Sequence, residues 1–217
     1  MSRKQLELNP RKSLFYQVVA LILRGIATVI SRPTVRGGAN IPATGPVLIA
    51  PTHRSNVDFA FSLFMTKRKV FFMAKDSLFG IPIVGRAIIA LGAFPVARGT
   101  ADRDAMRAAQ SVLAAGHALI LFPEGTRKYG ATVDDLLDGT MFIAAREQAT
   151  VVPVGLAGTE TFAANLKRGR LARVTIVIGE PITPPEASER VSRSDVSAKT
   201  VELQRKLQLA LDEAQGN

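Results

Sequence analysis

The sequence predicts a single α/β domain with a mainly parallel central sheet flanked by helices. Short apolar runs that suit buried strands alternate along the chain with longer segments that suit helices. This alternation is typical of a parallel sheet with helices on its faces. The length of 217 residues favours one domain with a sizeable core, and the apolar fraction of 47% is that of a folded protein.

Each element is predicted from its local pattern. The predicted strands are short apolar runs, at residues 47–50, 70–74, 93–97, 118–122, 151–156 and 174–178. The predicted helices occupy residues 13–31, 57–66, 82–91, 101–115, 139–148 and 195–213. The first helix ends at Arg32-Pro33, because a residue before proline avoids the helical conformation. Pro82 suits the first turn of a helix, and Gly116 suits a helix C-terminus.

The N-terminal segment 1–34 is predicted to associate with a membrane, and residues 35–217 to form the α/β domain. The net charge is +10, and residues 1–40 contain seven basic residues and one acid around the apolar segment Leu14 to Ile30. Cations beside an apolar helix favour an anionic membrane surface as partner. The alternative is a solvated basic face on a core helix. Arg24 disfavours a membrane-spanning helix, and the lack of a small-x-small cleavage site disfavours a signal peptide.

Composition excludes or disfavours several functional classes. Cysteine is absent, which excludes disulfides, thiolate catalysis and Cys-based zinc sites. Only two histidines occur and they are far apart, so no metal site is predicted. A basic chain can bind nucleic acid. However, Trp is absent, aromatic residues make up 6% and the charge gathers around an apolar segment, which disfavours a nucleic-acid partner.

His53 is the histidine that the sequence singles out for chemistry. It ends an apolar strand, and Asp58 follows five positions later. Positions five apart on a helix point in different directions. The two side chains therefore meet only if His53 lies in a turn and Asp58 in the first turn of the next helix, with Ser55 as N-cap and Asn56 as the first helical residue. The carboxylate would then orient the imidazole as a base. The alternative is a capping box from Ser55 to Asp58. The other histidine, His117, lies at an element boundary, which predicts a structural role.

A second polar motif, Phe122 to Arg127 (FPEGTR), follows another predicted strand. It supplies a carboxylate, a glycine that permits close backbone approach, a hydroxyl and a guanidinium that can bind phosphate through two parallel hydrogen bonds. The alternative is a turn with a solvated arginine. Lys75 and Arg98 close two further strands. Ligands bind at the carboxyl ends of strands in such sheets, so these cations predict a phosphate pocket; alternatively each is a solvated charge.

Four short segments occur in a specific order and spacing. They are a His-x4-Asp motif at 53–58 (HRSNVD), then 92–98 (GAFPVAR), 122–127 (FPEGTR) and 151–155 (VVPVG). Together they resemble the four blocks of the glycerolipid acyltransferases, in particular the bacterial 1-acyl-glycerol-3-phosphate (lysophosphatidate) acyltransferases. The likeness covers about residues 35–180. Thr52 stands where the family usually has asparagine, and Asp138-Gly139 where many members have Lys-x-Gly.

The resemblance implies a site and its substrates. His53 would be the general base and Asp58 its orienting partner. Polar residues would hold the glycerol-phosphate acceptor, namely Glu124, Gly125, Thr126 and Arg127, with phosphate contacts from Lys75 and Arg98. The family uses acyl-CoA or acyl-carrier protein as co-substrate, with no further cofactor expected. It acts on a lysophosphatidate-type lipid at the cytoplasmic face of the cell membrane, which implies peripheral or monotopic attachment.

The predicted reaction transfers a fatty-acyl group to the free hydroxyl of 1-acyl-glycerol-3-phosphate and gives phosphatidic acid. His53 would take the hydroxyl proton as the oxygen attacks the thioester. No Gly-x-Ser-x-Gly segment is present, so no acyl-enzyme is required. The alternatives are a related acyltransferase for glycerol-3-phosphate, another lysophospholipid or a glycolipid, and, more distantly, a nucleic-acid-binding protein. The segment 78–96 is expected to line an acyl groove or touch lipid, or else to form a buried core helix.

Overall fold

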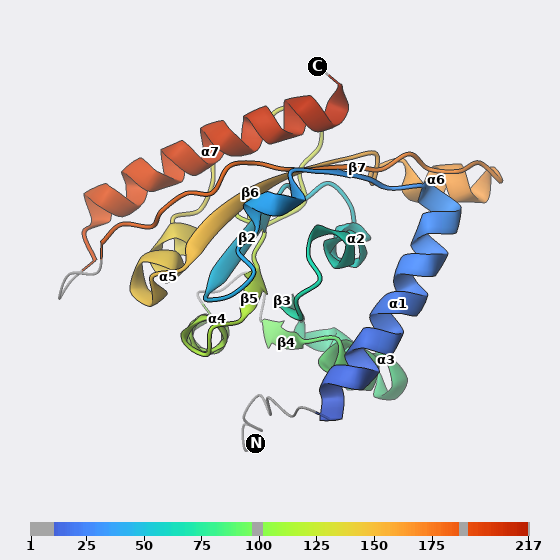
Figure 1. The fold of residues 1–217 in the computed structure, drawn as a ribbon, viewed down its shortest axis with the longest axis horizontal. Helices are drawn as coiled ribbons and strands as arrows, with labels where there is room; N and C mark the ends of the chain where they lie inside the picture. Colours follow the sequence, from blue (N-terminus) through green and yellow to red (C-terminus); the bar gives the residue numbers. More distant parts are fainter. Residues whose placement is uncertain (1–10, 97–101, 187–190, 217) are drawn as a thin grey trace.

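The strands form one sheet at the centre of the molecule (Figure 1). The computed structural model describes residues 11–96, 102–186 and 191–216. Within these residues the strands are β1 (Thr34–Arg36), β2 (Val47–Pro51), β3 (Val70–Lys75), β4 (Ala93–Val96), β5 (Ala118–Ile120), β6 (Thr150–Ala157) and β7 (Thr175–Ile178). Their order across the sheet is β1-β7-β6-β2-β5-β3-β4, and every neighbouring pair except β6–β7 is parallel. The predicted mainly parallel sheet is confirmed.

Helices cover both faces of the sheet. The α-helices are α1 (Arg11–Ser31), α2 (Asp58–Met65), α3 (Pro82–Ala90), α4 (Arg103–Ala114), α5 (Gly139–Glu147), α6 (Phe162–Lys167) and α7 (Arg193–Gln215), with 3-10 turns η1 (Gly38–Asn40) and η2 (Asp76–Gly80). Helices α4, α5 and α7 pack on one face, and α2 packs on the other. Helix α1 lies against α2 and α3, away from the sheet (Figure 1).

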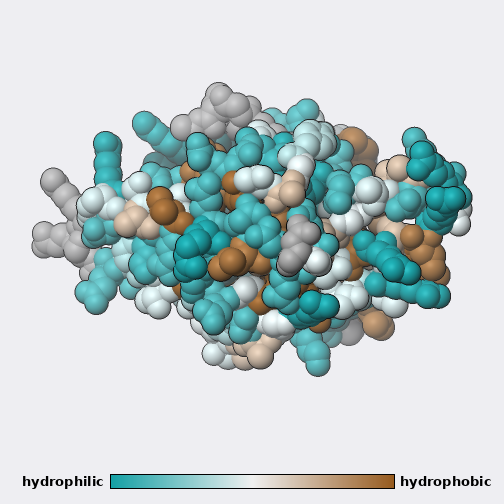
Figure 2. Space-filling model, turned by 90° about the horizontal axis from the view of Figure 1, so that it is seen from above, coloured by the Kyte–Doolittle hydropathy of each residue, from teal (hydrophilic) through white to brown (hydrophobic). Residues whose placement is uncertain are grey.

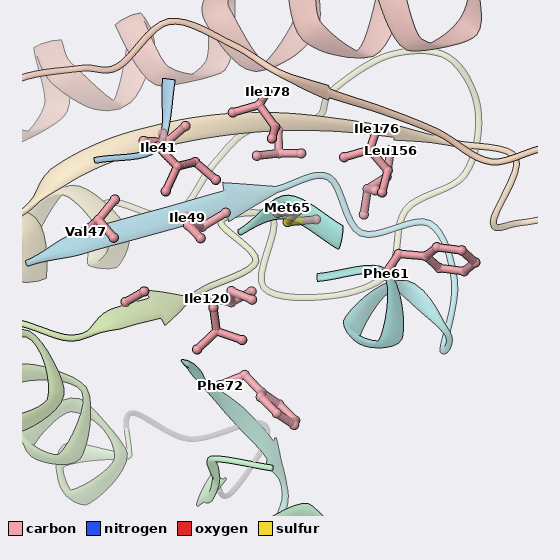
Figure 3. Close-up of a cluster of buried hydrophobic side chains, with 14 of the residues drawn as sticks. Ile41, Val47, Ile49, Phe61, Met65, Phe72, Ile120, Leu156, Ile176 and Ile178 are labelled. Carbon is pink, nitrogen blue, oxygen red and sulfur yellow. The ribbon is translucent and has the colours of Figure 1, made fainter. Parts of the chain in front are cut away.

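Two hydrophobic clusters hold these layers together. Successive strand residues point to opposite faces, so Val47 and Ile49 of β2 pack on the α2 side, whereas Leu48 and Ala50 pack on the opposite side. Figure 3 shows the first cluster, in which Phe61 of α2 lies beside side chains from the strands. Because β2 is buried on both faces, it is a continuous apolar run, and this pattern made it recognisable in the sequence.

Two elements were not predicted from the sequence. Strand β1 has three exposed residues and follows Pro33, so it carries no apolar signal. It exists because it pairs with β7. Helix α6 is six residues long and begins at Phe162. None of its residues is buried, so it too lacks a core-facing pattern.

The expected start of α2 is wrong. The helix begins at Asp58 rather than Asn56, and its N-cap is Val57 rather than Ser55. The carboxylate of Asp58 reaches back to the backbone N–H groups of Arg54 and Ser55. This arrangement keeps the preceding residues in a turn, outside the helix.

Helix α1 is anchored to α2 through Arg24, the residue whose charge disfavours a membrane-spanning helix. Arg24 donates to the carbonyl oxygens of Leu63 and Thr66, at 2.6 and 2.7 Å. These carbonyls lie at the end of α2, where helical partners are missing. Tyr16 and Ala20 pack on Leu63 beside them. The opposite side of α1 leaves apolar side chains exposed, namely Val18, Leu21, Ile22, Ile26 and Val29.

The segment 78–96 does not form a buried core helix. Gly85 is the only buried residue of α3, and Ile83 is 84% exposed. The alternative of a core helix is therefore wrong, and contact with lipid or an acyl chain stays a prediction. In the part of the chain that the structure describes, no helix combines the length and the apolar character needed to cross a bilayer.

Candidate active site

His53 and Asp58 meet at the carboxyl end of the central strand β2. The imidazole Nδ1 lies 2.9 Å from the Oδ2 of Asp58. The same Oδ2 accepts hydrogen bonds from the backbone N–H groups of Arg54 and Ser55, each at 2.7 Å. Asp58 is fully buried, and the His53 side chain is 12% exposed. One carboxylate therefore orients the histidine and also accepts hydrogen bonds from the backbone of the preceding turn. The alternative of a capping box from Ser55 is wrong, because the N-cap is Val57 and the Ser55 hydroxyl accepts from the backbone N–H of Val57 rather than that of Asp58.

The His53 ring is also held from the side. Phe122 stacks on it, with ring centroids 4.1 Å apart and planes 26° apart. Phe122 lies at the start of the loop that follows β5, and β5 is the strand next to β2. Ring stacking and the bond to Asp58 together define the orientation of the imidazole, and they leave Nε2 as the nitrogen that can take a proton.

Glu124 faces the histidine loop from inside the protein. Its Oε2 accepts a hydrogen bond from the backbone N–H of His53 at 2.8 Å. Its two carboxylate oxygens also accept from Nη1 of Arg54, at 2.8 and 3.1 Å. The side chains of Glu124 and Arg54 are 0% and 3% exposed. These contacts make Glu124 a positioning residue for His53, and a direct contact with the acceptor stays a prediction.

Further bonds join the loops after β2 and β5 into one unit. The backbone N–H of Lys128 donates to the carbonyl of His53 at 2.8 Å, and Nη2 of Arg54 donates to the carbonyl of Thr132 at 3.1 Å. At the other side, Thr52 Oγ1 accepts from the backbone N–H of Leu156 in β6 at 3.0 Å. The threonine that departs from the family pattern thus ties β2 to β6.

The remainder of the FPEGTR motif forms an exposed turn. Gly125 has a φ of +69°, a left-handed backbone conformation that favours glycine. Thr126 and Arg127 are exposed. Among the described residues, the Arg127 guanidinium has no hydrogen-bond or ion-pair partner. This leaves it available to bind an anion beside the His53 loop.

A comparison with protein-family models matches the part of the chain that holds these residues. The family model described as Acyltransferase matches residues 32–157, which include the His-x4-Asp and FPEGTR segments. This chain belongs to the acyltransferase family. The resemblance inferred from its four segments is confirmed.

The chain is also similar to named bacterial proteins and to a solved structure. The chain is 27% identical to the 1-acyl-sn-glycerol-3-phosphate acyltransferase of Bacillus subtilis, over 88% of this chain and 94% of that protein. It is 33% identical to the Streptococcus pneumoniae protein of that name, over 71% of this chain and 55% of that one. The crystal structure of Thermotoga maritima PlsC, titled a 1-acyl-sn-glycerophosphate acyltransferase, superposes with a TM-score of 0.74 and 25% identity, covering 95% of this chain and 82% of that one.

Other relatives are longer. The chain is 30% identical to a Chlamydomonas reinhardtii 1-acyl-sn-glycerol-3-phosphate acyltransferase, over 73% of this chain but 49% of that protein. It thus spans about half the length of that relative.

Lys75 and Arg98 are not brought to the histidine by the described contacts. Lys75 ends β3 and is exposed. Ala74 belongs to the cluster on the α2 side, so strand alternation directs Lys75 to the opposite face. Arg98 lies outside the described residues. For both, phosphate binding stays a prediction. In residues 11–96, 102–186 and 191–216, no group of three or more His, Cys, Asp or Glu side chains is arranged to hold a metal ion.

The second histidine lies at the amino ends of the parallel strands, opposite the edge that carries His53. His117 precedes β5, and its ring contacts Phe71 at a centroid distance of 5.2 Å. Burial lowers the pKa of His117, and the nearby charges of Lys69 and Arg68 lower it further. The packing agrees with the predicted structural role.

Arg54 is the main site residue that the sequence analysis missed. It lies inside the His-x4-Asp motif, where any residue type is allowed. A buried arginine needs a carboxylate partner, but the sequence alone does not reveal that Arg54 is buried. Its partner Glu124 lies 70 residues away.

Proposed function

We propose that this chain transfers a fatty-acyl group from a thioester to the free hydroxyl of 1-acyl-glycerol-3-phosphate, giving phosphatidic acid. The donor is acyl-CoA or acyl-carrier protein. The observation that carries the proposal is the pairing of His53 with the buried Asp58 at the carboxyl end of β2, beside the exposed Arg127 turn. The names of the relatives support the lipid acceptor.

The contacts of His53 support a role as general base. With its Nδ1–H donated to Asp58, Nε2 takes the proton of the acceptor hydroxyl as the oxygen attacks the thioester carbonyl. An ester C–O bond forms and the C–S bond breaks. The sulfur leaves with the proton that His53 had taken. The buried carboxylate stabilises the imidazolium between these two transfers.

Arg127 is the phosphate anchor that the exposed turn supports best. Its guanidinium can form two parallel hydrogen bonds with a phosphate, and the Thr126 hydroxyl beside it can add another. A phosphate held there places the glycerol backbone next to the histidine loop, since both loops are joined by hydrogen bonds. Lys75, which ends β3, would add positive charge at the same edge of the sheet, and Arg98 stays a predicted phosphate contact.

We propose that the protein acts at an anionic membrane surface, on the cytoplasmic face of the cell membrane. The exposed apolar side of α1 supports it, as does Ile83 on the neighbouring α3. Apolar side chains on adjacent helices can enter the boundary between headgroups and acyl chains without spanning the bilayer.

The test measures products rather than substrate consumption. Purified protein is incubated with acyl-CoA or acyl-carrier protein and a panel of acceptors, and the lipids are identified by mass. Phosphatidic acid formed from 1-acyl-glycerol-3-phosphate supports the proposal. Acylation only of glycerol-3-phosphate, of another lysophospholipid or of a glycolipid would assign one of the alternative acceptors.

Two matched variants test the base. His53→Gln should lower the turnover by about 10²- to 10⁴-fold, the usual contribution of a general base. His117→Gln changes the other histidine, at the opposite sheet edge, and should leave the turnover near that of the wild type. Near wild-type turnover of a folded His53→Gln protein would exclude the proposed mechanism.

A further inference from the structure

A basic and apolar segment comprises the last residues of α6 and the turn after it. Between residues 166 and 173 the chain carries four cations and two exposed leucines, namely Lys167, Arg168, Arg170, Arg173, Leu166 and Leu171. Leu166 is 51% exposed and Leu171 is 48% exposed. No acidic residue occurs between Glu160 and Glu180. We call residues 166–173 the basic loop.

The charges of the basic loop are not neutralised within the described part of the protein. All four cationic side chains are exposed, and none has an ion pair or side-chain hydrogen bond with another described residue. Exposed, solvated cations are common on protein surfaces and do not by themselves indicate a binding site. Here two exposed leucines lie among the four cations, a combination that suits a surface with both negative charge and apolar depth.

The backbone of the loop has a defined shape. Gly169 has a φ of +65°, and the N–H groups of Arg168 and Arg170 both donate to the carbonyl of Asn165, at 3.0 and 2.9 Å. The buried Ala172 donates its N–H to the carbonyl of Ile30 in α1, at 3.2 Å. The cations are therefore presented on a closed turn attached to the end of α1.

This attachment makes the loop continuous with an apolar surface. Near its C-terminal end, α1 exposes Ile26 and Val29, at 53% and 71%. At the right-hand end of the molecule in Figure 2, where Figure 1 places α6, hydrophilic side chains surround a hydrophobic patch. An anionic bilayer complements both parts of this surface, whereas an acidic soluble protein would complement only the charges.

The loop also lies at the edge of the sheet that carries the active site. It follows β6, whose carboxyl end lies beside that of the parallel β2. Phe162 of α6 contacts Phe61 of α2 edge-on, at a centroid distance of 5.8 Å, and α2 begins at Asp58. A membrane bound to the basic loop would therefore lie at the sheet edge where β2 ends and the His53 loop begins.

We propose that the basic loop docks on the anionic lipid headgroups of a membrane. The cations bind lipid phosphates, and Leu166 and Leu171 enter the interface. The inference rests on the proposed membrane association and adds a second contact to that of α1, one that requires lipid charge. It makes attachment depend on the anionic lipid content of the bilayer.

The test uses the full chain and two charge-matched variants. The loop variant carries Lys167→Gln, Arg168→Gln, Arg170→Gln and Arg173→Gln. The control variant removes the same charge from exposed positions on α4, α5 and α7, through Arg103→Gln, Arg107→Gln, Arg146→Gln and Arg193→Gln. Binding is measured by cosedimentation with phosphatidylcholine vesicles, with and without phosphatidylglycerol, and circular dichroism compares the folds.

The loop variant should lose about tenfold or more of its partitioning onto phosphatidylglycerol vesicles, because each surface cation contributes to binding. The control variant should lose less than about twofold, and the two should bind equally to phosphatidylcholine. Leu166→Ser with Leu171→Ser provides a second variant that keeps the charge, and it should weaken binding to both vesicle types. Equal losses in the loop and control variants, or no loss in the loop variant, would overturn the proposal.

Acyl transfer in detergent separates this inference from the proposed function. The loop variant should keep its rate on detergent-dispersed acceptor and lose rate when the acceptor is embedded in anionic vesicles. A wild-type protein that binds vesicles through the loop without acyl transfer would refute only the proposed function. A loop variant that binds vesicles normally but uses acyl-carrier protein poorly would assign the loop to that acidic partner and overturn the membrane proposal.

Discussion

The carboxylate of Glu124 accepts the backbone N–H of His53 at 2.8 Å while it also forms a buried ion pair with Arg54. The single acid of the FPEGTR motif therefore has its partners inside the protein. It holds the loop that carries His53, and in this way it connects the two motifs that lie 71 residues apart. The same motif therefore has a buried carboxylate at Glu124 and an exposed guanidinium at Arg127.

Breaking this pair should damage both stability and activity. Glu124→Leu leaves the Arg54 guanidinium buried without its partner, which should cost about 3–5 kcal/mol in the free energy of unfolding. The double variant Arg54→Met with Glu124→Leu replaces the pair with apolar side chains and should recover most of that loss. It should not recover turnover, because the His53 N–H still lacks its acceptor. Urea unfolding and initial rates measure the two quantities, and a double variant with normal turnover would contradict the positioning role.

The ring of Phe122 should affect turnover more than substrate affinity. Phe122→Leu removes the stacking on His53, worth about 0.5–1.5 kcal/mol, and should lower kcat by about two- to tenfold with little change in KM. Phe71→Leu is the matched control, since Phe71 contacts His117 at the other sheet edge. Equal reductions of kcat in both variants would indicate a general loss of packing rather than a loosened base.

Arg24 should stabilise the protein by joining α1 to α2. Arg24→Met keeps the apolar stem but removes the donors to the carbonyls of Leu63 and Thr66, which should cost about 1.5–3 kcal/mol. Arg36→Met removes an exposed ion pair with Glu213 and should cost clearly less. Denaturant midpoints measure both. An Arg24→Met protein as stable as Arg36→Met would show that the two hydrogen bonds contribute no more than a surface pair.

His117 should make stability depend on pH. Burial, followed by Lys69 and Arg68, lowers its pKa below the ordinary value of 6.5, so the unfolded state binds the proton more readily than the folded state. The contribution is complete above that ordinary pKa and is lost as the pH falls through the lower folded pKa. The stability advantage of the wild type over His117→Gln should therefore shrink as the pH is lowered from about 8 to about 5. An advantage that grows on acidification would contradict the direction of the shift.

Local patterns were sufficient for the fold class. Strands such as β2 are buried on both faces and therefore appear as uninterrupted apolar runs. Because β2 and β5 are parallel, their carboxyl ends lie at one edge of the sheet. The sequence alone therefore predicted that the His-x4-Asp and FPEGTR motifs, which follow these strands, lie close together. Strand β1 and helix α6 escaped prediction because they are short and largely exposed, and only pairing or contact with distant segments maintains them.

The sequence by itself determined the fold class, the His53–Asp58 pair and the family. These depend on residue types at fixed short spacings, which the chain carries in full. The tertiary structure alone decided that Glu124 faces Arg54 and the His53 backbone, that Arg24 caps α2 and that the basic loop adjoins α1. Each of these depends on which side chains are buried and which charges meet across many residues. Burial and long-range pairing arise only when the chain has packed, because they follow from the desolvation of groups that are far apart in sequence.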